Sequence, residues 1–285
     1  MKSNIVIGII GGTGILGTIF KKFFEEQGYE VLVSGRNTKL TSEELVKGAK
    51  VVIFCVPIDV TAEAIKSVIP YLREEQLLMD FTSVKLFSVK EMLKSRASVI
   101  GLHPMFGKVE SVCGKTVVVV PARPGDWQEW IVDLLKKGEM KVKVTTADEH
   151  DKIMSVLQGL VHFNYISLSY TLKEESEKLG LDINDLLDYG GVIYDLRLGT
   201  MARTLGQDPE LYADLSMYNE EIKKRIKENL RQVEKLKKII DRKDKVEFIK
   251  YFKEGVKFYK DFEKEALRDS AFLIKQLSKR KLEDK

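Results

Sequence analysis

The feature that most restricts the fold is a change in hydrophobic pattern near residue 147. Before this point, short runs rich in β-branched residues alternate with stretches of helical periodicity, a pattern typical of a parallel, doubly wound α/β sheet. After Thr145 the strand-like runs stop and only helical periodicity remains. We therefore expect an α/β domain over residues 1–146 and an all-helical domain over residues 147–285.

The expected elements follow from these two periodicities. Strands are expected at Ile5–Ile10, Glu30–Ser34, Val51–Val56, Leu77–Phe81, Ser98–Leu102, Thr116–Val120 and Lys141–Thr145. Helices are expected at Gly14–Gln27, Thr61–Leu72, Val84–Lys94, Asp126–Lys137, 147–178, Ile193–Leu205, 209–240 and 245–279. No repeat or flexible linker separates the halves, so we expect the helix that begins near Ala147 to join them.

Length and composition exclude several classes of protein. The 285 residues are 44% hydrophobic and 32% charged, which suits two packed domains and does not suit a disordered chain. No apolar run reaches the roughly 20 residues of a membrane span, and the first residues do not resemble a signal peptide. We expect a cytoplasmic protein that does not bind membranes.

Cysteine and histidine usage argues against a metal centre. The chain has 2 cysteines without Cys-x-x-Cys spacing and 3 dispersed histidines. We therefore expect neither a disulfide framework nor a metal site.

The net charge of +4 comes from a Lys-rich C-terminal part, where basic and acidic residues are interleaved at helical spacing. This pattern indicates amphipathic helices with solvated faces, so we expect no nucleic-acid binding.

The first motif is a Gly-x-Gly-x-x-Gly pattern directly after the first expected strand and at the start of a helix, which is the Rossmann-type dinucleotide context. It consists of Gly12, Thr13, Gly14, Ile15, Leu16 and Gly17. We expect Gly12 to permit the tight turn, Gly14 to let a pyrophosphate approach the backbone and Gly17 to let the helix pack closely. The helix N-terminus then holds the phosphates.

The end of the second expected strand indicates which dinucleotide binds. NAD sites usually carry a carboxylate there, whereas this chain has Ser34, Arg36 and Thr38. These three side chains can donate hydrogen bonds to a 2′-phosphate, and Arg36 adds a positive charge. We predict NADP as the cofactor, with NAD as the alternative if Arg36 is only a surface residue of the loop.

The histidines differ in context. His103 follows the fifth expected strand, at the edge where α/β sheets bind ligands, which favours a functional role over a turn-capping one. His162 lies in an otherwise apolar helix, where either a ligand or other core groups can satisfy it. His150 is expected at the protein surface or as a helix cap.

Two further residues are candidates for the same site. Ser83 follows the fourth expected strand and places a hydroxyl beside the ammonium of Lys85, although it can also cap the next helix. Arg203 is a lone arginine in a mostly apolar helix and needs an anionic partner there. That partner is either a bound substrate or a structural carboxylate.

Several segments together resemble the prephenate dehydrogenases and their arogenate-using relatives. The matching segments are Gly101–Gly107 (GLHPMFG), Asp80–Lys85 (DFTSVK), Cys55–Thr61 (CVPIDVT), Glu149–Asp151 (EHD) and Gln207–Leu215 (QDPELYADL). The resemblance covers nearly the whole chain and is strongest to the dehydrogenase part of mutase-fused enzymes. Because this chain begins at its nucleotide-binding part, we expect no mutase segment before it.

The resemblance implies oxidative decarboxylation of prephenate to 4-hydroxyphenylpyruvate in tyrosine biosynthesis, with hydride transfer to NAD(P)+. It implies that His103 is the catalytic group, that Ser83 lies near the nicotinamide and the reacting hydroxyl, and that Arg203 binds a substrate carboxylate. It also implies that the helical domain binds substrate and forms a homodimer.

Other positions take their expected roles from the same resemblance. Residues matching His162 and Tyr212 belong to the pocket for substrate or for tyrosine as a feedback inhibitor. Val56 and Pro57 are expected to contact the nucleotide. The choice between prephenate and arogenate stays open, since Lys108-Val109-Glu110 departs from the sequence that often follows the histidine motif.

Two other functions are compatible with parts of the sequence. The glycine-rich turn and Ser34-Gly35-Arg36 also resemble the start of coenzyme F420-dependent NADP reductases, which lack the HPMFG and QDPxLYAD segments. A dinucleotide-sensing regulator, without turnover, is the non-enzymatic alternative. The joint presence of His103, Ser83 and Arg203 argues against such a regulator.

Overall fold

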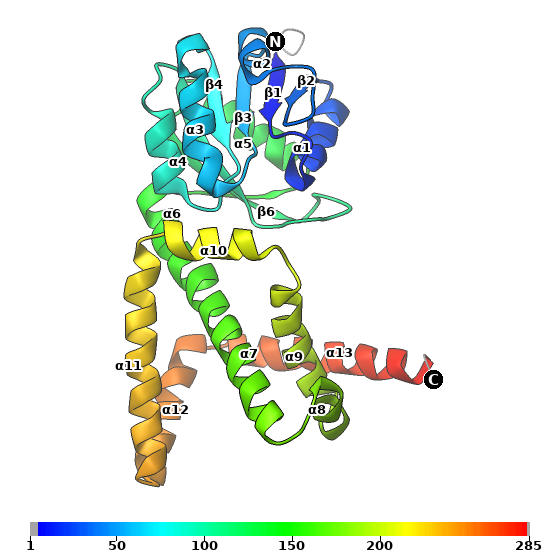
Figure 1. Ribbon diagram of the computed structural model, residues 1–285, viewed down its shortest axis with the longest axis vertical. Coiled ribbons are helices and arrows are strands. Elements are labelled where there is room, and N and C mark those ends of the chain that lie inside the picture. Colours follow the sequence, from blue (N-terminus) through cyan, green and yellow to red (C-terminus); the bar gives the residue numbers. More distant parts are fainter. Residues whose placement is uncertain (1–4, 284–285) are drawn as a thin grey trace. The chain divides into compact units, whose positions relative to one another are not determined.

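The computed structural model of the chain describes residues 5–283, which fold into two compact units (Figure 1). The first unit extends to Leu157 and also includes Glu210–Glu221, and the second consists of Gln158–Pro209 and the chain from Ile222 onward. Two segments after residue 146, up to Leu157 and Glu210–Glu221, thus belong to the unit that contains the sheet. The division at residue 146 into a dinucleotide-binding and a substrate-binding domain stays a prediction.

The first unit is built on a seven-stranded sheet with the order β2-β1-β3-β4-β5-β6-β7. The strands are β1 (Val6–Ile10), β2 (Glu30–Ser34), β3 (Val51–Phe54), β4 (Leu77–Asp80), β5 (Ser98–Pro104), β6 (Thr116–Arg123) and β7 (Lys141–Val144). All seven expected strands are present, which confirms the α/β prediction. The sheet is parallel, as expected, except at one pair, since β5 and β6 are antiparallel. No helix lies between them, and a parallel connection would need one to cross the sheet.

The helices of the first unit pack on both faces of the sheet. They are α1 (Ile15–Glu26), α2 (Ser42–Gly48), α3 (Ile58–Val68), the 3-10 turn Ile69–Tyr71, α4 (Lys85–Met92), α5 (Trp127–Lys137), α6 (Ala147–Met154) and α10 (Pro209–Tyr218). One buried cluster joins α1 and α5 to the sheet, and a second joins α2, α3 and α4 to its other face. Both faces are covered, as expected of a doubly wound fold.

The second unit contains helices only. They are α7 (Val161–Lys178), α8 (Ile183–Tyr189), α9 (Val192–Leu205), α11 (Glu221–Asp241), α12 (Lys245–Tyr259) and α13 (Phe262–Glu283). The helix expected over 147–178 is interrupted by a π-helical segment, Ser155–Leu160, between α6 and α7. No helix within residues 5–283 is long and apolar enough to cross a bilayer.

Two of the long expected helices are in fact pairs of helices. The chain breaks between α10 and α11 at Asn219, whose side chain donates to the carbonyl of Asp151 at 2.8 Å and accepts from the N–H of Glu221 at 3.1 Å. It breaks again at Lys260, whose φ of 51° is left-handed. The helices α2 and α8 were not expected at all.

The alternation of side chains along the sheet determines which face carries each functional group. In β5, Ile100 and Leu102 point into the cluster of α1 and α5. Val99 points into the opposite cluster, and the period of two places Gly101 and His103 on that same face. His103 therefore lies on the side of the sheet covered by α2, α3 and α4.

Candidate active site

The glycine-rich turn after β1 has the steric requirements of a phosphate-binding turn, with one change of role. Gly11 has the positive φ of 82°, and a Cβ there would lie 2.2 Å from the carbonyl oxygen of Cys55. Gly11, which lies outside the predicted motif, is thus the residue that permits the tight turn. The role predicted for Gly12 is wrong, because Gly12 is needed instead to leave room for Val33, whose Cγ1 would lie 2.7 Å from an added Cβ.

The start of α1 offers an open cradle. Gly14 is the N-cap of the helix, no side chain caps it, and the first turn contains no acidic residue. An added Cβ on Gly14 would meet only the carbonyl oxygen of Gly11, at 3.4 Å, whereas one on Gly17 would lie 2.6 Å from the Cα of Gly12. The backbone of the turn therefore approaches Gly17 too closely for any larger residue. The uncapped N–H groups and the space above Gly14 fit a pyrophosphate.

The rest of the turn frames this cradle. Thr13 lies against Gly35, where an added Cβ would be 2.9 Å from its Oγ1. Ile15 is 60% exposed at the start of α1, and Leu16 packs toward the core beneath. The loop after β3 lies beside the turn, since Cγ1 of Val56 would be 2.8 Å from a Cβ on Gly11, and Pro57 is the N-cap of α3.

At the end of β2, only one of the three predicted phosphate ligands has a side chain free for a ligand. Ser34 is buried and its Oγ lies 3.2 Å from that of Ser42. Thr38 closes the turn by accepting from the N–H of Gly35 at 2.8 Å and donating to backbone carbonyls. Arg36 is exposed and makes no hydrogen bond or ion pair with residues 5–283.

His103 lies within β5, not in a loop, and is only 2% exposed. Its Nδ1 is 2.8 Å from Nε2 of His150. The expectation that His150 is a surface or capping residue is wrong, because it is buried and Thr146 caps α6 instead. The second ring nitrogen of His103, Nε2, makes no hydrogen bond within the described part of the chain.

His150 is held in turn by Asp151. Its Nδ1 lies 2.7 Å from Oδ1 of the Asp151 carboxylate. The same carboxylate accepts from the backbone N–H groups of Lys85, at 2.8 Å, and Leu86, at 3.0 Å, which begin α4. Asp151 thus caps α4 from a distant helix. The alternative that Ser83 caps α4 is wrong, because Val84 is the N-cap, and half-buried Ser83 makes no capping bond.

A buried ion pair lies behind His103. The ammonium of Lys85 is fully buried against Asp80, and it donates to the carbonyl of Leu102 at 2.8 Å. The Cδ methylene of Lys85 packs against Gly101, where an added Cβ would lie 3.0 Å from it. The ammonium lies at the end of β4, at the edge of the sheet where it was expected, but it is buried there. Burial, with help from His150 and the charge of Lys85, holds the pKa of His103 well below its usual value.

The other predicted substrate residues are divided between the two units. Tyr212 lies on α10 in the first unit, and His162 on α7 and Arg203 on α9 lie in the second. Arg203 is exposed in this chain, so the burial argument for its partner is wrong, although its role stays a prediction. Half-buried His162 has its pKa lowered by burial. Neither residue lines the apolar groove between α7, α8 and α9.

Comparison with known proteins decides the family. Residues 25–144 match the family model described as the prephenate dehydrogenase nucleotide-binding domain, and residues 146–254 match its dimerization domain. The chain is 33% identical over 279 residues to the T-protein of Haemophilus influenzae, covering 95% of this chain and 71% of that protein. The chain belongs to the prephenate dehydrogenase family.

Other members agree with this assignment. A probable arogenate/prephenate dehydrogenase of Methanocaldococcus jannaschii is 37% identical over 279 residues, which cover 90% of this chain. The chain spans 62% of the length of that relative. A prephenate dehydrogenase structure from Aquifex aeolicus has the same fold, with a TM-score of 0.73, 22% identity, and coverage of 90% of this chain and 97% of that one.

In this member of the family, the strand ends could be predicted from the sequence, but the polar groups packed against His103 could not. The polar neighbours of His103 come from α6 and α4, and the pairing of His103 with His150 joins residues 47 positions apart. The Glu-His-Asp segment was the available signal, since it is part of the resemblance. Among residues 5–283, no group of three or more His, Cys, Asp or Glu side chains is placed to hold a metal ion.

Proposed function

We propose that this chain catalyses the NADP-dependent oxidative decarboxylation of prephenate to 4-hydroxyphenylpyruvate. The observation that carries the proposal is a buried imidazole, His103, near the carboxyl ends of the strands, the edge at which the glycine-rich turn lies. A doubly wound sheet binds its dinucleotide at that edge. Family membership argues against a coenzyme F420-dependent NADP reductase.

The residues of the turn fit a dinucleotide. The cradle above Gly14 and the uncapped start of α1 would hold the pyrophosphate, with Val56 and Pro57 beside it. Arg36 would pair with the 2′-phosphate, since the hydroxyls of Ser34 and Thr38 are already engaged. When bound, NADP+ supplies the hydride acceptor for the reaction.

His103 would handle the proton of the substrate. Its lowered pKa keeps the ring neutral at physiological pH, so Nε2 can accept a hydrogen bond from the C4 hydroxyl. As hydride leaves C4, the hydroxyl proton moves to Nε2. The bond from C1 to the carboxylate then breaks, its electron pair makes the ring aromatic, and the phenolate oxygen takes the proton back. No net proton is released or consumed.

The remaining predicted residues would orient the substrate. Arg203 would bind a carboxylate of the dianion, and Ser83 would hold the C4 hydroxyl near His103. His162 and Tyr212 are proposed for the pocket of the substrate or of tyrosine as an inhibitor. Orientation is the main requirement, because aromatisation supplies the driving force for loss of carbon dioxide.

We also propose a homodimer formed through the helical part of the chain. Among the described residues of the second unit, only three hydrophobic side chains are buried, those of Met201, Ile222 and Ile239. By contrast, Phe252 and Phe258, like many apolar side chains of α11, α12 and α13, are more than half exposed. So large an apolar surface is typical of an interface, and a second copy would cover it.

The test is a spectrophotometric assay of NADPH and NADH formation with prephenate and with arogenate. We expect turnover of prephenate with NADP+ and a loss of about 100- to 10,000-fold in kcat for His103→Asn with KM nearly unchanged. Faster turnover of arogenate would reassign the substrate. Tight NADP+ binding without turnover of either compound would instead support a dinucleotide-sensing regulator.

A further inference from the structure

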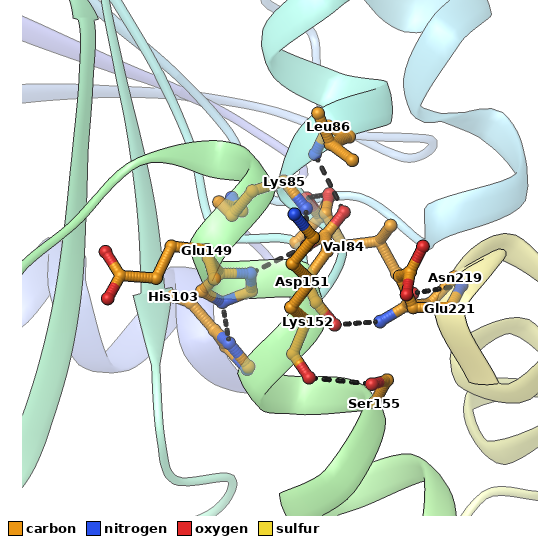
Figure 2. Close-up of polar contacts among 12 residues, drawn as sticks. Val84, Lys85, Leu86, His103, Glu149, Asp151, Lys152, Ser155, Asn219 and Glu221 are labelled. Carbon is orange, nitrogen blue, oxygen red and sulfur yellow. Dashed lines mark hydrogen bonds and ion pairs between the residues drawn. The ribbon is translucent and has the colours of Figure 1, made fainter. Parts of the chain in front are cut away.

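A continuous chain of buried polar groups leads from His103 to the start of α4. It runs from Nδ1 of His103 to Nε2 of His150 at 2.8 Å, and from Nδ1 of His150 to Asp151 at 2.7 Å. Asp151 ends the chain by accepting from the N–H groups of Lys85 and Leu86 (Figure 2). His103, His150 and Asp151 are each at most 2% exposed, so water does not replace these contacts.

The direction of each hydrogen bond in this chain follows from Asp151, the acceptor at its end. Asp151 accepts from two backbone N–H groups at the start of α4, and a carboxylate can only accept. Nδ1 of His150 must therefore carry the proton that points at Asp151. In a neutral imidazole the other nitrogen is then an acceptor, so Nε2 of His150 presents a lone pair to His103.

The assignment of donors and acceptors also determines the proton position on His103. Its Nδ1 must be the donor to His150, because two lone pairs 2.8 Å apart would repel each other. A neutral His103 with its proton on Nδ1 has its lone pair on Nε2. We propose that His150 and Asp151 are positioning residues that hold His103 in this tautomer, so that Nε2 is the atom that accepts the hydroxyl proton of the substrate.

The titratable groups around His103 are consistent with this arrangement. They are His150 and Asp151 from α6, Lys85 from α4 and Asp80 from β4. The ammonium of Lys85 is engaged with Asp80 and with the carbonyl of Leu102, so it does not compete for Nδ1. When Nε2 takes up the substrate proton, the carboxylate of Asp151 is the nearest negative charge along the hydrogen-bonded chain.

The substrate part of this inference rests on the proposed function, but the tautomer can be measured without substrate. The chain has 3 histidines, so long-range proton–nitrogen NMR correlation of 15N-histidine-labelled protein gives three ring systems. His162→Gln and His150→Gln assign them. At about pH 8, above the ordinary imidazole pKa of about 6.5, we expect Nε2 of His103 to be unprotonated. A proton on Nε2 in the wild type would overturn the proposal.

Variants test the control by His150 and Asp151. Asp151→Asn presents an amide N–H to His150, which should reverse both tautomers and put the proton on Nε2 of His103. We expect kcat to fall roughly 1,000- to 10,000-fold with little change in KM, the size of effect known for a wrong catalytic tautomer. The matched control is Asp148→Asn, the same chemical change on an exposed residue of α6, and it should alter neither spectrum nor kcat.

A second pair separates hydrogen bonding from packing. The amide oxygen of His150→Gln can still accept from Nδ1 of His103, whereas His150→Leu offers no acceptor. We expect Gln to keep at least about 10-fold more of the kcat than Leu does at similar thermal stability. Equal losses in both variants, with an unchanged His103 tautomer, would show a merely structural role and contradict the proposal.

The outcomes also separate this inference from the proposed function. If the wild type turns over neither prephenate nor arogenate but shows the expected tautomer, reversed in Asp151→Asn, the function is wrong and the positioning holds. If it turns over prephenate while His103 carries its proton on Nε2, the function holds and the positioning is wrong.

Discussion

The ammonium of Lys85 donates a hydrogen bond to the carbonyl oxygen of Leu102, at 2.8 Å, directly before His103 in β5. This buried cation therefore fixes the backbone that carries the imidazole. Its charge adds to the effect of burial in lowering the pKa of His103. The ammonium is itself compensated by Asp80, since an unpaired buried charge would be costly. This arrangement determines how the activity should depend on pH.

The acid limb of the kcat/KM profile should reflect the lowered pKa of His103. Protonation of His103 removes the acceptor, so activity is lost only as the pH falls through that pKa, well below 6.5. The double change Asp80→Asn with Lys85→Met removes the cation without leaving an unpaired carboxylate. Its acid limb should move to higher pH. Lys90→Met, an exposed residue of α4, is the control, and an unmoved limb in the double variant would contradict the role of Lys85.

Arg36 should decide between the two dinucleotides. Arg36→Leu removes a charge-assisted contact worth about 1.5–3 kcal/mol, so KM for NADP+ should rise about 10- to 100-fold. KM for NAD+ provides the internal control, because NAD+ has no phosphate at that position, and it should stay within about twofold. Equal KM changes for both dinucleotides would remove Arg36 from the 2′-phosphate site.

The glycines of the turn should separate stability from cofactor binding. A Cβ at Gly17 would lie 2.6 Å from backbone of Gly12, so Gly17→Ala should lower the unfolding free energy of the cofactor-free protein by about 1–3 kcal/mol. A Cβ at Gly14 has space, so Gly14→Ala should leave the Tm unchanged while weakening dinucleotide binding. Denaturant titration and calorimetric binding measure the two effects. A Gly14→Ala protein that binds NADP+ normally would show that no phosphate lies there.

Arg203 should act on substrate binding. Arg203→Ala is expected to raise KM for prephenate at least about 10-fold with a smaller effect on kcat, since the carboxylate contact exists in both ground and transition states. Arg197→Ala is the matched control on α9, because Arg197 is exposed and stacks over Tyr194 instead. An Arg203→Ala enzyme with wild-type KM would mean that another cation binds the substrate carboxylate.

Features controlled by neighbouring residues could be predicted from the sequence. Strand, turn and helix at Gly12–Gly17 follow one another within a short segment, and each has its own local signal. The missed helix α2 also had such a signal, because Thr41 and Glu44 form a capping box. Asp182 and Asp185 do the same for α8.

Features that depend on tertiary pairing could not be predicted. The strand β5 runs past Leu102 to Pro104 because β6 pairs with it, as the register of His103 with Val118 shows. Polar residues such as Lys85 and His150 look like surface residues in the sequence, and only the packing of α4 and α6 reveals that they are buried. Their partners lie far along the chain, where no periodicity reports them.

The reversed direction of β6 has a consequence for how relatives of this chain can diverge. Residues 105–115 connect the end of β5 to the start of β6 at one end of the sheet, and Phe106 and Val112 of this connection pack against the cluster of α1 and α5. Insertions between Phe106 and Val112 would leave these two contacts, the strand register and the covering helices in place. Evolution can thus reshape the surroundings of His103 independently of the scaffold.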